Sequence, residues 1–283
     1  MKKKILANLL FYTGISYLLF RIRLLSTGIR VINYHCTPNY SVTLFKKHLK
    51  FYKKYFEDVN LIKLSNFYDK TDNGLRKSPG LIISFDDGLR SNFDNAIGLM
   101  EDFGFTGWFF IPAGFLLDPS KNFTIKNSIE TKQVYSDNRY GMSLDEAKHI
   151  SVNHIVGSHT FTHHRMSVND TQTTLIHEIR QSKHTLEELL ELREISCFCW
   201  VGGELNTYTS EAYRMIKDAG YKYIFTTNTQ PIYRDSNPFM ICRSNIEAED
   251  SIQIVLFQLS GIMDLAYFKR RKQVKKIFCL DIG

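Results

Sequence analysis

The sequence predicts an α/β protein, a distorted (β/α)7-type barrel with mostly parallel strands. Short apolar runs rich in β-branched and aromatic residues alternate with helical patterns, which is typical of a parallel sheet. No proline-, glycine- or serine-rich linker divides the chain, so we expect one domain to account for most of its 283 residues. A hydrophobic content of 43% is sufficient to fill a core of that size.

Seven runs are expected to form strands, and five longer stretches are expected to form helices. The strand candidates are residues 29–34, 81–85, 106–111, 154–157, 195–201, 223–226 and 239–242. Because most of these runs are short and continuously apolar, we expect both of their faces to be covered. The helix candidates are residues 43–56, 92–103, 171–192, 210–219 and 252–265, and Gly220 follows one of them where a helix commonly ends.

Polar side chains follow several of the predicted strands at the points where the strands end. Enzymes with β/α barrels carry their chemistry at the carboxyl ends of the strands, so these positions are candidates for a site. Ordinary turn residues also occur there, and the coincidence therefore supports the architecture without proving it. The positions are His35, Asp86, Asp87, His159, residues 200–203 and Arg243.

Two short segments carry the groups best suited to chemistry. Residues 84–88 read Ser-Phe-Asp-Asp-Gly, and residues 158–163 read Ser-His-Thr-Phe-Thr-His. Taken alone, the first segment is well explained as a turn, and the two histidines share a face only if their segment is helical. Together, two carboxylates and two imidazoles can hold a divalent metal ion and leave one carboxylate as a base for water. The residues themselves do not say which aspartate has which part.

The paired segments resemble the first two motifs of the polysaccharide deacetylases, the NodB-homology or carbohydrate esterase family 4 group. The resemblance covers roughly residues 30–264. It implies that Asp86 is the catalytic base and that Asp87, His159 and His163 bind a divalent metal ion, with zinc expected first. It further implies a hydrolase that removes acetyl groups from the N-acetylated sugars of a polysaccharide or glycolipid, so that an acetylated glycan is the expected partner.

The third motif of that family is altered in this chain. It usually contains a proline, whereas residues 198–204 read Phe-Cys-Trp-Val-Gly-Gly-Glu. A loop with glycines can still offer a backbone N–H to an oxyanion. The arginine that usually accompanies the base is not found in this stretch, so Arg243 is our substitute candidate. A surface or structural arginine is the alternative explanation for Arg243.

The C-terminal histidine that serves the family as general acid is also absent, because no histidine follows His184. A permuted branch, which acts on poly-N-acetylglucosamine-type glycans, takes this histidine from an N-terminal strand ending in Tyr-His. Residues 31–35 read Val-Ile-Asn-Tyr-His and resemble that strand, so His35 is the expected acid and His164 a weaker candidate. A glycan-binding protein with a decayed site and an O-acetyl esterase remain the alternatives.

Two further groups of residues are best explained by packing. Cys197 and Cys199 are two apart in an apolar run, and we expect them to be buried, reduced thiols on one side of a strand. Aromatic side chains can stack on sugar rings, but a place in the core is favoured for the four candidates near strand ends. These four are Trp108, Phe109, Phe110 and Trp200.

The formal net charge of +7 is concentrated at the two ends of the chain. No nucleic-acid-binding motif accompanies the basic residues, so no nucleic-acid partner is expected. An apolar run at residues 5–20 lies between lysines and arginines and is shorter than the roughly 20 residues of a spanning helix. A helix lying in the membrane interface is favoured, with a cleaved signal peptide, a short anchor or an ordinary packed helix as alternatives.

These patterns divide the chain into three parts. Residues 1–27 are expected to associate with a membrane, residues 28–265 to form the catalytic domain, and residues 266–283 to form a basic tail. The expected location is therefore a membrane, through peripheral contact with an anionic surface or through a short anchor.

Overall fold

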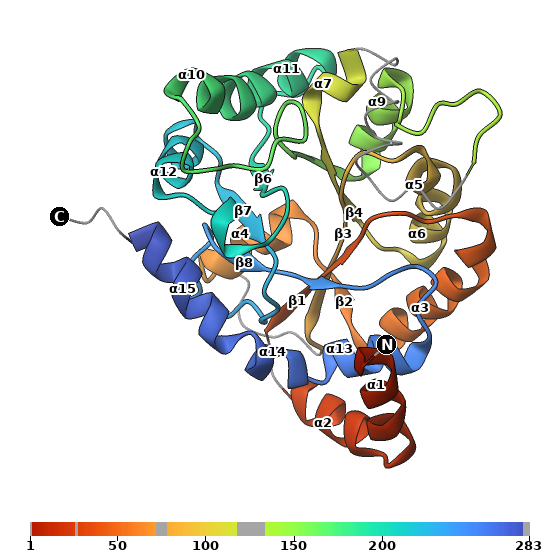
Figure 1. The fold of residues 1–283 in the computed structure, drawn as a ribbon. Coiled ribbons are helices and arrows are strands. Elements are labelled where there is room, and N and C mark those ends of the chain that lie inside the picture. The colour runs from red at the N-terminus through yellow and green to blue at the C-terminus, as the bar shows by residue number, and fades with distance from the viewer. Residues whose placement is uncertain (1, 26–27, 72–77, 118–133, 280–283) are drawn as a thin grey trace.

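The computed structural model describes residues 2–25, 28–71, 78–117 and 134–279, and its centre is a barrel of parallel strands (Figure 1). From β1 to β7, neighbours in the barrel follow one another along the chain, and β2 pairs with β3 outside this order. The predicted distorted β/α barrel is confirmed. The strands are β1 (Ile29–Tyr34), β2 (Glu57–Asp58), β3 (Gly80–Phe85), β4 (Gly107–Ile111), β5 (Ile155–Ser158), β6 (Cys197–Cys199), β7 (Tyr223–Thr226), β8 (Ile241–Cys242) and β9 (Ser244–Asn245).

The barrel is closed by one short segment, residues 241–245, which pairs with two different strands. Its first half, β8, pairs with β7, and its second half, β9, pairs with β1. Arg243 stands between the halves, where its N–H donates to the Thr226 carbonyl and its own carbonyl accepts from the Thr229 N–H. Of the last predicted strand, residues 239–242, only Ile241–Cys242 forms a strand, and β9 follows beyond the predicted range. Arg243 lies between the two, at the closure of the barrel.

Alternate residues of the strands contribute to two different parts of the core. Val31, Ile82 and Phe110 belong to a cluster inside the barrel, whereas Ile32 and Ile83 belong to the cluster between the strands and the helices. This arrangement explains why the runs are apolar without alternation, since both faces of each strand are covered. Cys197 and Cys199 are buried free thiols of the interior cluster, and all four aromatic candidates for sugar stacking are at most 1% exposed, so the packing explanation is confirmed for both groups.

Helices surround the barrel, and several differ from the predicted ones. The stretch 92–103 is broken at Ala96, and the stretch 252–265 is broken near Gly261, whose φ of 85° ends the regular helix. Helix α9 was not predicted, although Ser143 and Glu146 form a capping box at its start. The helices are α1 (Lys2–Tyr12), α2 (Ile15–Arg23), α3 (Val42–Tyr55), α4 (Leu61–Tyr68), α5 (Arg90–Asn95), α6 (Ile97–Phe103), α7 (Ala113–Leu117), α9 (Leu144–Asn153), α10 (Gln172–Leu175), the π-helix η3 (Ile176–Gln181), α11 (Ser182–Leu189), α12 (Ser210–Asp218), α13 (Ile252–Leu259), α14 (Ile262–Ala266) and α15 (Phe268–Cys279), with single 3-10 turns η1 (Asn39–Ser41) and η4 (Leu205–Thr207).

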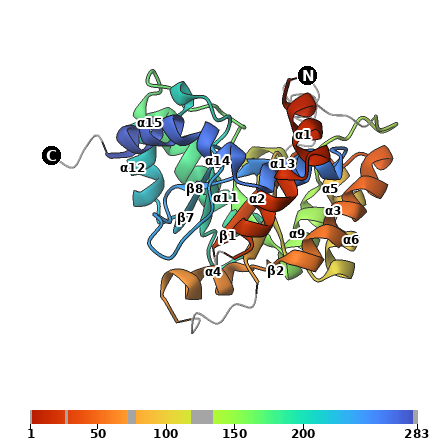
Figure 2. The same cartoon turned by 90° about the horizontal axis from the view of Figure 1, so that it is seen from below.

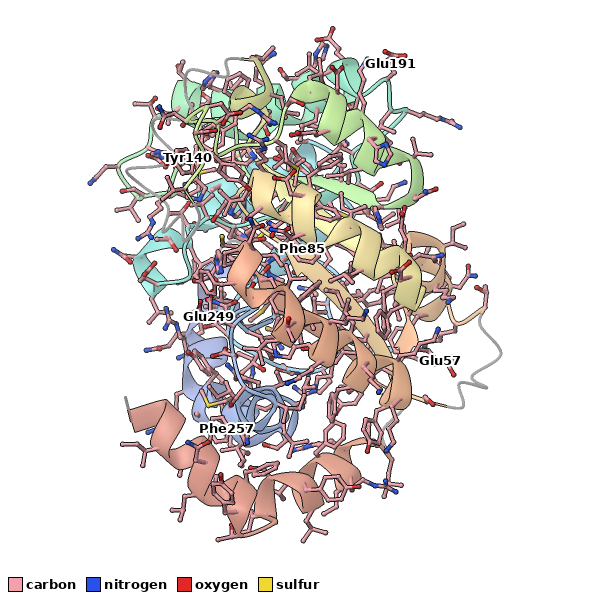
Figure 3. All side chains as sticks on the ribbon, turned by 90° about the vertical axis from the view of Figure 1, so that its right-hand side faces the viewer. Glu57, Phe85, Tyr140, Glu191, Glu249 and Phe257 are labelled. Carbon is pink, nitrogen blue, oxygen red and sulfur yellow. The ribbon has the colours of Figure 1, made fainter. Side chains whose placement is uncertain are left out.

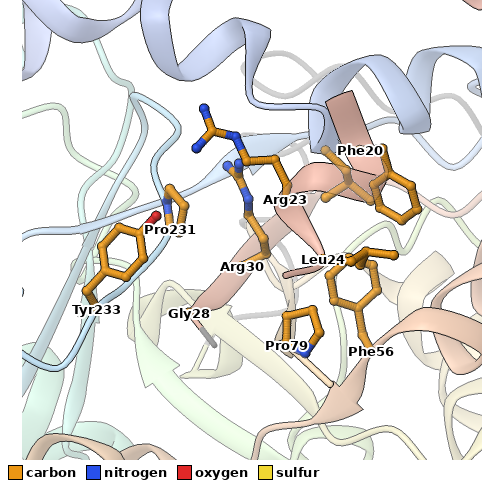
Figure 4. Close-up of a pocket in the computed structure, with 10 residues that line it drawn as sticks. Phe20, Arg23, Leu24, Gly28, Arg30, Phe56, Pro79, Pro231 and Tyr233 are labelled. Carbon is orange, nitrogen blue, oxygen red and sulfur yellow. The ribbon is translucent and has the colours of Figure 1, made fainter. Parts of the chain in front are cut away.

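Helices α1 and α2 pack on the outside of the barrel, over α13 (Figure 2). Ala7 of α1 lies in a small cluster with Ile254 and Phe257 of α13, and Phe20 of α2 is buried in the main core. Within the described residues no single helix is long and apolar enough to cross a membrane, and α1 and α2 reach that length only together, bent by 84°. The end of α2 meets the barrel at a small crevice that Arg23 and Arg30 also line (Figure 4).

The basic residues near the C-terminal end form helix α15, which packs against α12 and the loop after β6. Phe278 stacks on Tyr213 with ring centroids 4.1 Å apart, and on Trp200 with centroids 5.7 Å apart. Val274 of the same helix is fully buried. Because Trp200 belongs to the stretch that carries the altered third motif, α15 supports the loop at the carboxyl end of β6.

This packing predicts a difference between two phenylalanines of α15. Phe278→Ala should lower the free energy of unfolding by about 3 kcal/mol, because a buried ring is lost and a cavity remains. Phe268→Ala is the matched control, since Phe268 is 50% exposed and its removal should cost less than about 0.5 kcal/mol. Urea unfolding of the full chain measures both values, and equal effects would contradict the described packing of α15.

Candidate functional site

The site begins at a sharp turn after β3. Asp86 and Asp87 follow the strand directly, and Asp87 has a φ of 72°, in the left-handed region. Gly88 follows with a φ of 61°, and a Cβ atom there would lie 3.0 Å from Cγ2 of Ile111. Glycine is therefore required both by the backbone conformation and by the close approach of β4. The turn directs the two neighbouring carboxylates toward different partners.

Asp86 is buried and forms a two-pronged ion pair with Arg243. Nη1 and Nη2 of Arg243 each lie 2.7 Å from one carboxylate oxygen, and Nδ2 of Asn33 donates to Oδ2 at 3.0 Å. Burial would raise the pKa of Asp86, but the charge and hydrogen bonds of Arg243 outweigh it, and the pKa lies below its usual range. The carboxylate is thus held in one orientation and in its charged form.

Asn33 is a site residue that the sequence reasoning did not single out. Its Oδ1 accepts from Nη1 of Arg243 at 2.8 Å and from the Ser84 hydroxyl at 2.9 Å, while its amide donates to Asp86. The only available signal was a polar residue in the otherwise apolar run at 31–34. A buried amide in such a run requires polar partners, but the sequence does not identify them.

Asp87 faces the two predicted histidine ligands. Its Oδ1 lies 3.0 Å from Nε2 of His163 and 3.4 Å from Nε2 of His159. Burial would raise the pKa of Asp87, but hydrogen bonds from both histidines hold it well below its usual range. Nδ1 of His159 lies 3.0 Å from the Cys199 carbonyl and donates to it, which fixes the orientation of the ring with Nε2 on the side of Asp87.

These three side chains are suited to a divalent metal ion. One ligand atom from each of Asp87, His159 and His163 lies within 4.8 Å of the other two. A carboxylate oxygen and two imidazole nitrogens are a common ligand set for zinc and similar ions. A second cluster joins Asp86, His159 and Cys199. It is less suited, because burial raises the pKa of the Cys199 thiol and Arg243 already occupies the Asp86 carboxylate.

The histidines converge through a loop, and the helix assumed for their spacing is not present. Thr160 and His163 have φ values of 66° and 63°. Glu178, on the π-helix η3, accepts hydrogen bonds from the backbone N–H groups of Phe161 and Thr162 at 2.9 Å each. These bonds hold the loop in place. The sequence predicted one regular helix over 171–192, and a buried π-helix of this kind often marks a functional site. Glu178 was missed because it gave no local signal.

The metal-ligand cluster lies in an open cavity with a volume of about 250 Å³. His35 lines this cavity with a side chain that is 36% exposed, and its Nδ1 lies 3.9 Å from Oε1 of Glu247, a second residue that the sequence reasoning missed. His164 instead places Nε2 3.0 Å from Asp170. The lining residues are Asn33, His35, Cys36, Asp86, Asp87, His159, His163, Arg165, Val201, Gly202, Thr227, Asn245 and Glu247.

The altered third motif reaches the same cavity. Val201 and Gly202 line it, and Gly202 has a φ of 84°. The following residue, Gly203, donates its N–H to the Glu204 carboxylate at 3.2 Å. The loop therefore presents backbone at the cavity without the usual proline, while Trp200 just before it is buried against α15. Arg243, at the barrel closure, contacts the carboxylate that the missing arginine was expected to serve.

Comparison with known proteins gives a family match for the sequence and related structures for the fold. The polysaccharide deacetylase family matches residues 74–224, which include both aspartates and both candidate histidine ligands and exclude His35 and Arg243. None of the curated proteins matches the chain in sequence. The fold is similar to that of the Streptococcus pyogenes deacetylase PplD, solved with acetate (TM-score 0.63, 15% identity, 82% of this chain and 98% of that one).

Two other solved structures have the same fold. IcaB from Ammonifex degensii is similar with a TM-score of 0.63 and 16% identity over 83% of this chain and 98% of that one. A de-N-acetylase from Aggregatibacter actinomycetemcomitans gives a TM-score of 0.61 and 14% identity over 80% of this chain and 98% of that one. Because the family match spans more than half of the chain and includes the Asp-Asp-Gly and His-x-x-x-His segments, the chain belongs to the polysaccharide deacetylase family.

Proposed function

We propose that this protein is a metal-dependent hydrolase that removes N-acetyl groups from a glycan of the poly-N-acetylglucosamine type. The observation that carries the proposal is the convergence of two differently paired aspartates and two histidines in one open cavity that His35 also lines. Family membership supports a deacetylase of polysaccharides. The Tyr34–His35 strand end supports the permuted branch, because it brings a histidine to the cavity from the N-terminal side of the chain.

Asp87, His159 and His163 would hold the ion, and zinc is the metal that we propose for two imidazoles and a carboxylate. When bound, such an ion polarises the acetyl carbonyl and makes a water molecule more acidic. The chain prepares the ligands for this role: the Asp87 carboxylate is charged, and the Cys199 carbonyl fixes the orientation of the His159 ring.

Asp86 would act as the base. Arg243 and Asn33 hold its carboxylate next to the ligand cluster, and this carboxylate would take a proton from water as the oxygen attacks the acetyl carbon. A backbone N–H at the Val201–Gly202 edge of the cavity would stabilise the oxyanion.

His35 would act as the acid. Its ring would give a proton to the sugar nitrogen as the carbon–nitrogen bond breaks, so that acetate and a free amine are the products. The carboxylate of Glu247 lies beside this ring and interacts with it when the ring carries a proton. The half-exposed position of His35 at the cavity agrees with a group that must meet the substrate and then exchange protons with solvent.

A first prediction concerns the base. Asp86→Asn should lower the rate of acetate release from an N-acetylglucosamine oligosaccharide by about 10²–10⁴, because no carboxylate is left to accept the proton. Asp145→Asn is the control, since Asp145 is exposed on α9. Acetate is measured with zinc added in excess. A protein that binds the oligosaccharide but releases no acetate even as wild type would instead be a glycan-binding protein with a decayed site.

A second prediction separates the acid from the base. His35→Gln should reduce amide deacetylation by about 10²-fold or more, yet leave hydrolysis of an aryl acetate nearly unchanged, because a phenolate leaves without protonation. Asp86→Asn should reduce both reactions. If His35→Gln leaves acetate release from the oligosaccharide unaltered, the role of His35 is wrong. If wild type releases acetate from O-acetylated sugars alone, the protein is an O-acetyl esterase.

A third prediction uses metal content as its measurement. The purified chain should retain about one zinc ion per molecule after dialysis, and His163→Ala and Asp87→Ala should each lose most of it, because three protein ligands hold the ion. His184→Ala is the control, since His184 is largely exposed and interacts with Glu188. Elemental analysis gives the stoichiometry without reference to activity, and full zinc retention by both ligand variants would refute the proposed site.

A further inference from the structure

Four helices form a continuous surface on one flank of the barrel. Helices α1 and α2 lie in the middle, with α3 on one side and α15 on the other, as both Figure 1 and Figure 2 show. We call this the flank surface. No residue that lines the catalytic cavity belongs to these four helices, so the flank surface is separate from the proposed active site.

The middle of the flank surface is apolar. Nine of the nineteen exposed large hydrophobic side chains among the described residues lie within residues 5–25. Leu9 is 59% exposed and Leu18 is 61% exposed, and Leu265 of α14 and Phe268 of α15 are exposed as well. In Figure 3 the outer side chains of α1 and α2 project away from the domain, on the side opposite to Phe257 of α13. Contiguous apolar surface of this kind marks a contact with another body.

The apolar helices are fixed to the domain by their inner sides. Ala7 and Phe20 are fully buried, and Phe20 packs with its ring centroid 5.3 Å from Phe51 and 5.2 Å from Tyr55 of α3. Since α1 and α2 are bent by 84° and held in this way, they lie along the barrel wall. Their exposed side chains therefore form a preformed face rather than a spanning helix.

The borders of the flank surface are basic. None of α1, α2, α3 and α15 contains an aspartate or glutamate. On α3, Lys46, Lys50 and Lys54 are exposed and spaced four residues apart, which puts them on one face of the helix. Lys54 lies beside Tyr17 of α2, whose pKa is lowered by hydrogen bonds from Tyr55 and Arg21 and by the charges of Arg21 and Lys54.

The border on α15 is similar. Lys272 lies 4.5 Å from the ring centroid of Phe268, at the edge of the apolar patch. Lys269, Lys275 and Lys276 are also exposed along this helix. An apolar strip between two basic helices matches the interface of an anionic bilayer. There, apolar side chains contact the acyl chains, and lysines form ion pairs with the anionic headgroups.

We propose that the flank surface docks the enzyme on an anionic phospholipid bilayer. The exposed apolar side chains of α1 and α2 enter the interface, and the lysines of α3 and α15 contact the lipid headgroups. A second copy of the chain is a poorer occupant, because it would bring basic helices against each other. Nucleic acid would use the lysines but would leave the apolar strip exposed to water. Docking by this flank leaves the catalytic cavity free to accept a glycan near the membrane.

The test is flotation of the full chain with vesicles. We expect binding to phosphatidylcholine vesicles that contain about a third phosphatidylglycerol, and weak binding to phosphatidylcholine alone. Leu9→Glu with Leu18→Glu should reduce the bound fraction about tenfold or more. The matched control is Ile62→Glu with Val168→Glu, which replaces two exposed apolar side chains away from the flank surface and should leave binding unchanged.

The charge border is tested separately. Lys50→Glu with Lys54→Glu, and Lys272→Glu with Lys276→Glu, should each reduce binding to the anionic vesicles at least threefold, because attraction to the headgroups is lost. Arg180→Glu with Arg193→Glu is the control, since Arg180 in η3 and Arg193 shortly after α11 are exposed and lie outside the flank surface. A cooperative thermal unfolding transition is required of each variant, as evidence that it is folded.

Two outcomes would overturn the proposal. One is equal binding of wild type to neutral and anionic vesicles with no loss in the lysine variants. The other is a wild-type dimer by light scattering that Leu9→Glu with Leu18→Glu converts to a monomer while vesicle binding is retained. Acetate release from a soluble oligosaccharide is expected to be the same in wild type and all flank variants, so failure of this proposal is distinguishable from failure of the proposed catalysis.

Discussion

The buried ion pair between Arg243 and Asp86 is the interaction on which both the barrel and the site depend. Arg243 stands where the last segment changes its pairing from β7 to β1, so its side chain enters the barrel at the closure. There it meets the carboxylate that ends β3, with Asn33 of β1 between them. A buried charge without a partner is costly, so each member of this group requires the others. The strand ends that carry the site are thereby held together.

The same pair gives two adjacent aspartates different surroundings. Asp86 continues the direction of β3 and meets a guanidinium, whereas the left-handed backbone of Asp87 turns its carboxylate toward two imidazoles. A carboxylate already bound by Arg243 and Asn33 is a poor choice for a metal ligand, and one between two histidines is a good one. Backbone geometry therefore supports the proposed roles of Asp86 as base and Asp87 as ligand, which the residues alone do not distinguish.

The sequence predicted the barrel because buried parallel strands leave short apolar runs. It predicted the convergence of Asp87, His159 and His163 because Asp-Asp-Gly and the paired histidines stand at strand ends. It did not predict the second short strand beyond Arg243, since two-residue strands have too few residues to show a pattern. Asn33, Glu178 and Glu247 were missed for a related reason. Each acts through a partner between 16 and 212 positions away, and such pairings have no local signal.

The central claim is that Arg243 and Asp86 stabilise the fold as a unit, and a double-mutant cycle tests it most directly. Arg243→Met, Asp86→Asn and the double variant are compared with wild type by urea unfolding. Arg243→Met alone should lower the free energy of unfolding by about 3–5 kcal/mol, because it leaves a buried unpaired carboxylate. Adding Asp86→Asn should recover at least about 1 kcal/mol of that loss. Effects that add within about 0.5 kcal/mol would contradict the claim.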